Sequence, residues 1–141
     1  MELRDRRILA KMREEARLVS EFIDGIVYDE FKQNEKTKRA VSQTLANIGE
    51  LCHTLSDDVK ARYENVPWAA IRKTRNVITH AYESVDFLSI WYAAVNDIPS
   101  LVEDINAIER DIGIELYGTE EREANYDEIQ KAIEEADGRY A

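Results

Sequence analysis

Apolar residues recur at three- and four-residue spacing along most of this chain, which is the spacing that places them on one face of an α-helix. The first such set consists of Ile8, Met12, Ala16, Val19, Phe22 and Ile23. It predicts a helix over residues 2–24, and Gly25 follows as a residue that can end it. A short apolar stretch at residues 26–31 is expected to add a turn or two of helix, and the polar residues 32–36 are expected to form a loop.

A second long helix is predicted over residues 36–55. Its apolar stripe is formed by Val41, Leu45, Ile48, Cys52 and Leu55. Ser56 is followed by two aspartates, a combination that favours a turn and a helix N-cap. We therefore expect a short helical turn that ends near Tyr63.

The third helix is predicted over residues 68–82. Pro67 precedes it and suits a helix start, because the N–H that proline lacks would have no partner there. A fourth helix is expected to begin at Ser84, its N-cap, and to bury another apolar stripe. That stripe consists of Val85, Leu88, Trp91, Tyr92 and Val95.

Pro99 falls within an apolar pattern that continues beyond it. It predicts either a kink or a new helix start, with Asn96 or Asp97 as the cap. The pattern resumes with Leu101, Ile105, Ile108 and Ile112. It is expected to stop at Gly113. Because there is no strand pattern and no internal repeat, the predicted fold class is all-α, an antiparallel bundle of four to five helices.

The C-terminal residues 117–141 differ in composition from the rest and are rich in acidic residues. Residues 118–121 resemble a linker, and a narrow apolar stripe then predicts a short amphipathic helix from about residue 126. The stripe consists of Tyr126, Ile129, Ile133 and Ala136. An isolated helix of this length is marginal in water, so it is expected to pack on the body or on a partner chain. We therefore predict a helical domain at residues 1–116 and an acidic extension at residues 117–141.

Composition and charge narrow the classes of function. A chain of 141 residues with 44% hydrophobic and 34% charged residues is typical of one soluble globular domain. Acidic residues outnumber basic ones by 29 to 19, and the net charge of -10 argues against general nucleic-acid binding. A local basic cluster is still compatible with a polyanionic substrate. It consists of Lys60, Arg62, Arg72, Lys73 and Arg75.

Signals for export or membrane insertion are not found in the sequence. No apolar run is long enough to cross a bilayer, and the first residues lack the apolar segment of a signal peptide. The single cysteine, Cys52, excludes an internal disulfide and fits a reducing compartment. We therefore expect a cytoplasmic protein that does not associate with membranes.

Candidate chemistry concentrates on the third predicted helix. A rotation of about 100° per residue gathers its polar and aromatic side chains on one side. They are Trp68, Arg72, Arg75, Asn76, Thr79, His80 and Tyr82, opposite Ala70, Ile71, Val77, Ile78 and Ala81. Arginine binds phosphate with a planar fork, histidine can move protons near neutral pH, and a tyrosine hydroxyl can be modified. Structural roles are also open: Arg75 as an ion-pair partner, His80 as a complement to the helix dipole, and Tyr82 as a packing residue.

Other reactive residues lie close together at positions 50–53. Glu50, Cys52 and His53 do not have the spacing of a zinc site, so we predict no metal site. Cys52 belongs to the apolar stripe, which favours a thiol in the core. Glu50 lies off that stripe and could reach the third helix to pair with an arginine, and both a structural and a functional role stay open for it. Phosphate-binding glycine loops and serine-nucleophile motifs are absent from the sequence.

The spacing Arg75-x4-His80-x-Tyr82 resembles the R-x4-H-x-Y motif of HepT-like toxins, which are members of the HEPN superfamily of helical ribonucleases. Further segments resemble that family in the same order along the chain. They are Ile48-Gly49-Glu50, Val66-Pro67-Trp68, Arg75-Asn76, Ile90-Trp91 and Asp97-Ile98-Pro99. The resemblance covers residues 4–112 and does not include the residues after Tyr117.

This resemblance implies the toxin of a type VII toxin–antitoxin system. Such toxins are metal-independent endoribonucleases that form homodimers, in which the motif residues of both subunits face a shared basic cleft. The implied partner is a nucleotidyltransferase antitoxin of the MNT type, which silences the toxin by transferring AMP from ATP to the motif tyrosine, here Tyr82. ATP would serve as the AMP donor, and RNA cleavage itself would require no cofactor.

The resemblance also implies a role for each residue of the motif. His80 is expected to act as general acid or base, and Arg75 to stabilise the phosphate charge. Arg72, Asn76, Thr79 and Tyr82 are expected to position the substrate. AMP on Tyr82 would add bulk and negative charge that repel RNA. The alternatives are a non-catalytic subunit that binds nucleotide or substrate for a nucleotidyltransferase, and a purely structural dimeric adaptor.

Overall fold

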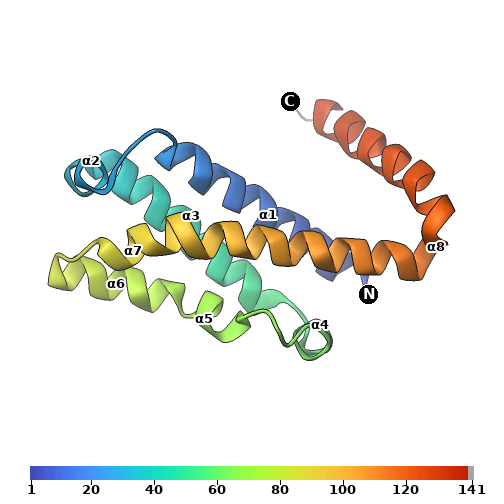
Figure 1. Ribbon diagram of the computed structural model, residues 1–141, viewed down its shortest axis with the longest axis horizontal. Coiled ribbons are helices and arrows are strands. Elements are labelled where there is room, and N and C mark those ends of the chain that lie inside the picture. Colours follow the sequence, from blue (N-terminus) through green and yellow to red (C-terminus); the bar gives the residue numbers. More distant parts are fainter. Residues whose placement is uncertain (140–141) are drawn as a thin grey trace. The chain divides into compact units, whose positions relative to one another are not determined.

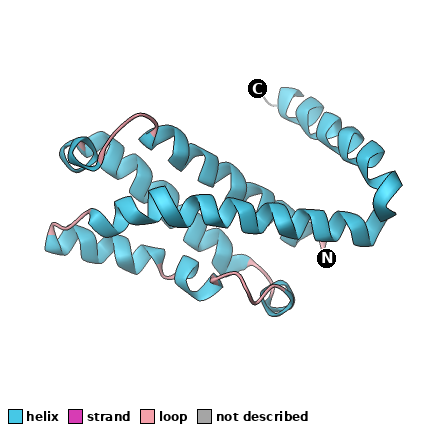
Figure 2. Cartoon of the chain, in the orientation of Figure 1, coloured by secondary structure: helices cyan, strands magenta, loops and turns pink. Residues whose placement is uncertain are grey.

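The computed structural model describes the backbone of residues 1–139 and the side chains of residues 1–113 and 130–135. Every regular element in the described backbone is a helix (Figures 1 and 2), which confirms the predicted all-α fold. The helices are α1 (Leu3–Ile23), α2 (Tyr28–Gln33), α3 (Glu35–Thr54), α4 (Asp57–Arg62), α5 (Trp68–Arg72), α6 (Thr74–Ser84), α7 (Leu88–Tyr92), the π-helical turn η1 (Ala93–Asp97) and α8 (Ile98–Arg139).

The chain forms two compact units, Met1–Ile105 and the residues from Asn106 onward. In the first unit α3 is the central helix, because it packs against α1, α2, α5 and α6. The apolar stripes predicted for the first two long helices and for residues 101–112 supply much of the buried core. The stripe predicted for the fourth helix is wrong, because Val85, Leu88 and Tyr92 are exposed. The core includes Leu9, Met12, Ala16, Val19, Val41, Leu45, Ile48, Cys52, Ile90, Ala94, Ile98, Leu101 and Ile105, all of them buried. The expected domain boundary after residue 116 stays a prediction.

The ends of the first helices follow from local chemistry. The φ angle of Gly25 is +72°, the left-handed conformation that glycine adopts without strain, and α1 ends just before it as predicted. Ser56 caps α4, also as predicted, because its Oγ accepts a hydrogen bond from the Val59 N–H at 3.3 Å. Both oxygens of the buried Asp5 carboxylate in turn accept hydrogen bonds from Ser56, at 2.9 and 3.0 Å, which joins the start of α1 to the start of α4.

The loop predicted at residues 32–36 is wrong. Helix α2 continues to Gln33, α3 begins at Glu35, and Asn34 alone separates them. The reason is a side-chain cap, since Asn34 Oδ1 accepts a hydrogen bond from the Thr37 N–H at 3.0 Å.

The helix predicted as continuous over residues 68–82 is broken at Lys73, between α5 and α6. The break faces Gly49 of α3. A methyl group placed on Gly49 would lie 3.1 Å from the carbonyl oxygen of Ile71 and 3.5 Å from that of Arg72. Thr74 stabilises the same carbonyl from the other side, because its hydroxyl donates to the Ile71 oxygen. The interruption therefore coincides with a close backbone approach in which a side chain larger than that of glycine would be crowded.

Ser84 does not cap the following helix, contrary to the prediction. It is the last residue of α6, and its hydroxyl donates to the His80 carbonyl at 2.8 Å. Val85 then adopts a left-handed conformation, with φ 55° and ψ 38°, and turns the chain toward α7. The N–H of Leu88 at the start of α7 is instead satisfied by the Asp86 carboxylate at 3.1 Å.

Pro99 does not start a new helix. The helix continues from α7 through η1 into α8, and Asn96 and Asp97 lie inside the π-helical turn without capping anything. In this turn the Ile98 N–H bonds to the carbonyl of Ala93, five residues earlier. The change of bonding pattern thus lies directly before Pro99, the residue that has no N–H to donate.

Gly113 does not end the helix either, because α8 runs through it and through the predicted linker at residues 118–121. One glycine inside a helix costs only about 1 kcal/mol, which neighbouring residues can offset. The predicted C-terminal helix from residue 126 lies within α8. Most of its apolar stripe lies outside the described side chains, and Ile133 is 48% exposed.

The close approach at Gly49 leads to a prediction on stability. Alanine is favoured over glycine in a helix by about 1 kcal/mol, but overpacking a tight contact costs about 1–3 kcal/mol. The contacting atoms at Gly49 are backbone oxygens that cannot rotate away, so we expect Gly49→Ala to lower the free energy of unfolding by roughly 1 kcal/mol and to speed amide exchange in residues 71–76.

Gly25→Ala is the matched comparison. Nothing lies within 4 Å of the added methyl group there, so the expected loss, about 1–2 kcal/mol, comes from the left-handed backbone alone. It should leave exchange in residues 71–76 unchanged beyond the global effect. Urea unfolding and hydrogen exchange measure both variants, and a more stable Gly49→Ala protein would contradict the packing argument.

Candidate functional site

The motif predicted from the sequence lies on α6, directly after the break at Lys73. Arg75, Asn76, Thr79 and His80 are all exposed, and their spacing places them on neighbouring turns of one face. The structure therefore brings these four predicted residues together on the surface. The Thr79 hydroxyl donates to the Arg75 carbonyl at 3.1 Å, so its proton is used within the helix and its oxygen can only accept a hydrogen bond from a ligand.

Arg75 is held by a residue of another helix. Its Nη1 atom lies 3.3 Å from Oε1 of Glu50 on α3, and 74% of the Arg75 side chain and 60% of the Glu50 side chain are exposed. Such an exposed ion pair contributes only about 0.2–1 kcal/mol to stability. Its effect on geometry is larger, because it fixes one edge of the guanidinium and leaves the other N–H groups directed to solvent. The pairing that the sequence left open for Glu50 is thus present.

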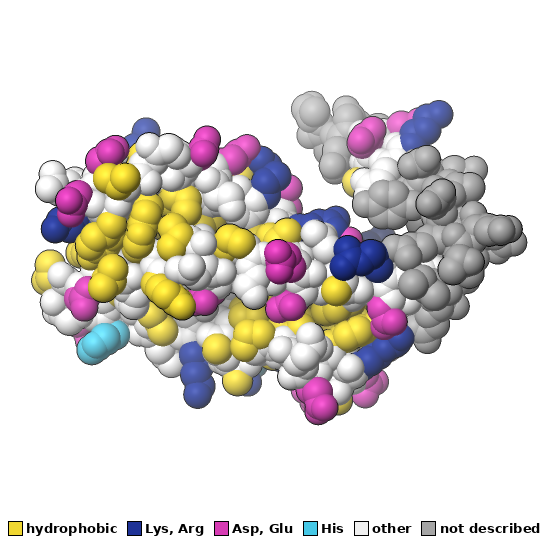
Figure 3. All heavy atoms as spheres, viewed as in Figure 1, with side chains coloured by type: hydrophobic (Ala, Val, Ile, Leu, Met, Phe, Trp, Pro, Cys, Tyr) yellow, Lys and Arg dark blue, Asp and Glu magenta, His cyan; other side chains and the backbone are white. Residues whose placement is uncertain are grey.

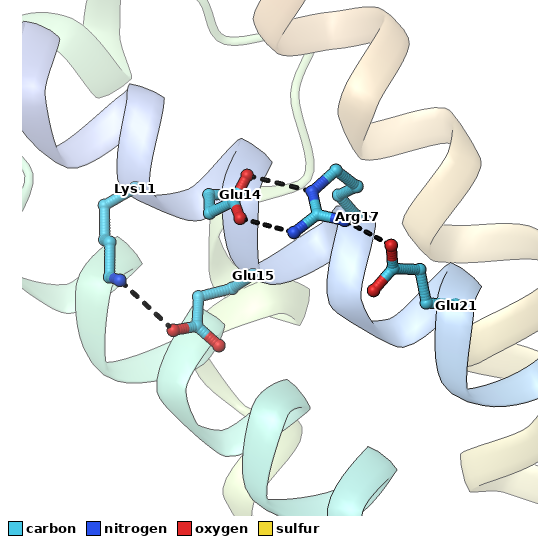
Figure 4. A network of polar contacts seen from close by, with 5 residues as sticks. All are labelled: Lys11, Glu14, Glu15, Arg17 and Glu21. Atoms are coloured by element: carbon cyan, nitrogen blue, oxygen red, sulfur yellow. Dashed lines mark hydrogen bonds and ion pairs between the residues drawn. The ribbon is translucent and has the colours of Figure 1, made fainter. Parts of the chain in front are cut away.

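Other exposed arginines of the protein are paired differently. On α1, Arg17 contacts Glu14 and Glu21, and Lys11 contacts Glu15 (Figure 4). These pairs join residues three or four positions apart on one helix, which is an ordinary surface arrangement. Arg75 and Glu50 are 25 residues apart, and their contact connects two helices at the motif.

The break at Lys73 changes the position of several predicted residues. Arg72 is exposed but ends α5, so it does not share a helix with the motif. Trp68, expected on the polar side, is 7% exposed, and its indole N–H donates to the Tyr63 carbonyl at 2.9 Å. Val77, expected in the core, is 40% exposed. The predicted faces are wrong here because a constant rotation of about 100° per residue assumes one unbroken helix across residues 68–82.

Tyr82 lies in a different environment from Arg75 and His80. Its side chain is half-buried, and its hydroxyl is buried without a hydrogen-bond partner among the described residues. The ring of Phe87 packs edge-on against the Tyr82 ring, with 5.1 Å between the centroids. The Arg39 guanidinium lies 6.0 Å from the centre of the Tyr82 ring. The sequence did not single out Phe87 or Arg39, because Phe87 lies outside the periodic stripes and Arg39 is distant from Tyr82 along the chain.

Cys52 is a core thiol, as its place in the apolar stripe predicted. It is fully buried, and its Sγ atom lies 3.5 Å from the Trp68 carbonyl oxygen as a donor. Burial raises the pKa of the Cys52 thiol, and the positive charges of Lys60 and Arg72 offset this only in part. A protonated, inaccessible thiol is a poor nucleophile and metal ligand.

His53, the residue after Cys52, is exposed. Among the described residues, no group of three or more histidine, cysteine, aspartate or glutamate side chains is suited to a metal ion.

An open apolar groove of about 580 Å³ lies beside the motif, between α5–α6 and α7–η1. Its lining includes Ala70, Thr74, Val77, Asp86, Leu88, Ser89, Tyr92, Ala93 and Asp97. Figure 3 shows hydrophobic atoms at the surface in the region where α6 and α7 lie side by side. Leu88 is 54% exposed and Tyr92 is 60% exposed, which is unusual for large apolar side chains gathered in one place.

A comparison with known protein families decides the classification. The family described as Ribonuclease HepT-like matches residues 12–108, which is more than half of the chain. The chain belongs to the HepT-like ribonuclease family. The matched range contains the whole motif on α6, Glu50 and the groove.

Curated proteins similar to this HepT-like chain carry names of the same kind. "Putative RNase MJ0127" of Methanocaldococcus jannaschii is 31% identical over 94 residues, which cover 67% of this chain and 78% of the relative. "Probable ribonuclease HepT" of Thermococcus cleftensis is 33% identical over 93 residues, which cover 66% of this chain and 84% of the relative. "Putative RNase TTE0752" of Caldanaerobacter subterraneus subsp. tengcongensis is 27% identical over 95 residues, covering 67% and 85%. No solved structure shows a significant match to the chain. None of the helices in the described part of the chain has the length and apolar character needed to cross a membrane.

Proposed function

We propose that this HepT-like protein is an endoribonuclease, the toxin of a type VII toxin–antitoxin system, and that Arg75 and His80 carry out the cleavage. The observation that supports this most directly is the exposed Arg75-x4-His80 pair on α6 of a chain in this family. The names of the relatives, which describe ribonucleases, agree with it.

RNA supplies its own nucleophile, so the protein has to provide only proton transfer and a positive charge for the phosphate. The 2′-oxygen bonds to the adjacent phosphorus, a base removes its proton, and the bond from phosphorus to the 5′-oxygen breaks while that oxygen gains a proton. The products are a 2′,3′-cyclic phosphate and a 5′-hydroxyl. His80 serves as the base or as the acid, since imidazole exists in both forms near neutral pH. Arg75 stabilises the charge on the pentacoordinate phosphorane.

Neighbouring residues complete the proposed site. Glu50 orients the Arg75 guanidinium through the contact at 3.3 Å. Asn76 and Thr79 border Arg75 and His80 on the same exposed face and position the phosphate or the imidazole. Arg72, at the end of α5, attracts the RNA backbone from the other side of the break.

One copy provides one histidine in the motif, His80, on a chain with a net charge of -10, and both features favour a homodimer. A second copy would bring another Arg75 and His80 to the same cleft and would concentrate basic charge there. We propose that the groove beside the motif receives this second copy. The apolar residues Val77, Leu88 and Tyr92 would then be buried, and Val77 lies on the same helix as the motif.

The last part of the proposal is the way in which the antitoxin inactivates this protein. A nucleotidyltransferase antitoxin transfers AMP from ATP to Tyr82: the phenolic oxygen bonds to the α-phosphorus, pyrophosphate leaves, and the phenolic proton passes to a base. The added phosphate and nucleoside, one turn or less from His80, would repel RNA. The support for this step is the motif Arg75-x4-His80-x-Tyr82 and the family.

The catalytic assignment is tested by alanine substitution. We expect His80→Ala and Arg75→Ala each to lower the rate of RNA cleavage by about 10²–10⁴, the range typical of losing a general acid–base group or a charge-stabilising group. Arg17→Ala is the matched control, because Arg17 is an exposed, carboxylate-paired arginine far from the motif in sequence. Gel-based cleavage of a labelled RNA measures the rates, and circular dichroism verifies folding. Full activity in both folded motif variants would refute the assignment of Arg75 and His80 as the catalytic residues. A folded wild-type protein that cleaves no RNA would refute the enzyme and leave the nucleotide-binding subunit as the better interpretation.

The proposed interface is tested by introducing a charge. Leu88→Glu should shift the protein from dimer to monomer, because a buried unpaired carboxylate is costly, and should reduce cleavage as well. Leu3→Glu is the control, since Leu3 is 58% exposed and lies outside the groove, whereas Leu88 is 54% exposed. Sedimentation velocity distinguishes the two states. A dimer that persists in Leu88→Glu would exclude this groove as the interface.

The modification is tested with Tyr82→Phe. The variant should lose the mass gain of an AMP unit that the wild type acquires with ATP and the partner enzyme, as read by intact-protein mass spectrometry. Because the hydroxyl has no hydrogen-bond partner among the described residues, its removal should change the free energy of unfolding by less than about 1 kcal/mol. An unchanged mass gain in Tyr82→Phe would show that another residue is modified.

A further inference from the structure

The buried position of the Tyr82 hydroxyl conflicts with its proposed modification. An oxygen that is to bond to phosphorus must be reached by a nucleotide, and this oxygen is buried with no hydrogen-bond partner among the described residues. Either the tyrosine is only a packing residue or the segment that covers it opens. The second possibility rests on the proposed function, and the structure contains specific features that favour it.

The segment that contacts Tyr82 is residues 84–87, which we call the corner because they join α6 to α7, and the contact is made by Phe87. Phe87 is 8% exposed and packs edge-on against Tyr82, with an interplanar angle of 83°. The Lys38 ammonium lies 4.1 Å from the centre of the Phe87 ring, on the side of α3. Lys38 also pairs with Glu35 at 3.1 Å, which keeps the cation in place over the ring. The burial of this aromatic ring and the cation–π contact therefore both stabilise the closed corner.

The same corner contains a backbone conformation that is unfavourable for its residue. Val85 has φ 55° and ψ 38°, and it is the one non-glycine residue with a positive φ in the described part of the chain. A β-branched side chain clashes with the backbone in this region, where helix ends normally place glycine or asparagine. The N–H groups of Val85 and Asp86 both donate to the Ala81 carbonyl and maintain the turn. The Val85 side chain itself is 77% exposed, so burial does not compensate for the strain.

These observations share one consequence. We propose that the corner is a latch that withholds the Tyr82 hydroxyl from the modifying enzyme, and that Val85 sets how often it opens. The closed state combines a strained Val85 with an unpaired buried hydroxyl, and opening relieves both. Burial of Phe87 opposes opening. The hydroxyl is thus exposed in a minor population, and modification would keep the latch open because a phosphodiester cannot return beneath the Phe87 ring.

Access to Tyr82 can be measured without the partner enzyme. N-acetylimidazole transfers its acetyl group to a phenolic oxygen, and imidazole leaves with the proton. Peptide mass spectrometry then gives the acetylation rate of Tyr82 in the folded protein and in the urea-unfolded chain. We expect the folded rate to be at least tenfold lower, and equal rates would overturn the proposal.

Two substitutions at Val85 test the role of strain. Val85→Gly and Val85→Asn accept the left-handed conformation, so both should slow acetylation of Tyr82 by about threefold to tenfold relative to the wild type. Val27→Gly and Val27→Asn are matched controls, because Val27 is 59% exposed but has an extended backbone with φ -105°. They should leave the Tyr82 rate unchanged. Unchanged or faster acetylation in both Val85 variants would overturn the proposal.

Phe87→Ala removes the cover and should raise the Tyr82 rate at least tenfold, while acetylation of the half-buried Tyr28 reports whether the fold is intact. A Tyr82 rate that stays at the wild-type value in folded Phe87→Ala protein would also overturn the latch.

AMP transfer to Tyr82 by the partner enzyme should follow the same order among the variants as acetylation. If the acetylation order holds and no AMP is transferred, the latch stands and the proposed silencing fails.

Discussion

The packing of α3 against the break between α5 and α6 determines where the motif lies. Because Gly49 has no side chain, α3 approaches the carbonyl oxygens of Ile71 and Arg72 more closely than two layers of side chains would allow. The next residue of α3, Glu50, thereby reaches the first turn of α6 and contacts Arg75. The orientation of the guanidinium thus depends on a backbone contact to which neither Arg75 nor His80 contributes. A small shift of the Arg75 guanidinium would be costly, because the chemistry of the site needs groups that are aligned with one another.

The sequence predicts the parts of the fold that depend on short-range patterns. Periodic apolar residues identify α1, α3 and the core, and Ser56 and Gly25 mark helix ends by chemistry that acts within a few residues. The break at Lys73 could not be predicted in this way, because its cause is a glycine on another helix. The contact of Phe87 with Tyr82 was not predicted either, because Phe87 lies in the turn after α6, outside the periodic stripes. For the candidate site, the sequence therefore identifies the residue types of the motif. It does not reveal which of these side chains face the solvent and which face the core.

The three residues of the motif are divided between two environments. Arg75 and His80 are exposed to water, where a long polymer can reach them without any rearrangement of the chain. Tyr82 is half-buried and contacts the Phe87 ring and the Arg39 guanidinium of α3. A substrate and a modifying enzyme would accordingly meet different barriers at positions only two residues apart. This separation fits a protein whose activity and whose regulation must respond to different partners.

The π-helical turn η1 constrains how many residues the segment from α7 to α8 can contain. A π-turn contains an extra residue, so the helix after it is rotated by about 100° relative to the helix before it. Leu88 and Tyr92 before the turn line the groove, whereas Ile98 and Leu101 after it enter the core. One uninterrupted helix thus contributes residues to the groove before the turn and residues to the core after it. The number of residues in this segment is consequently more constrained than their identity, since deleting one would rotate Ile98 and Leu101 out of the core while leaving the helix itself intact.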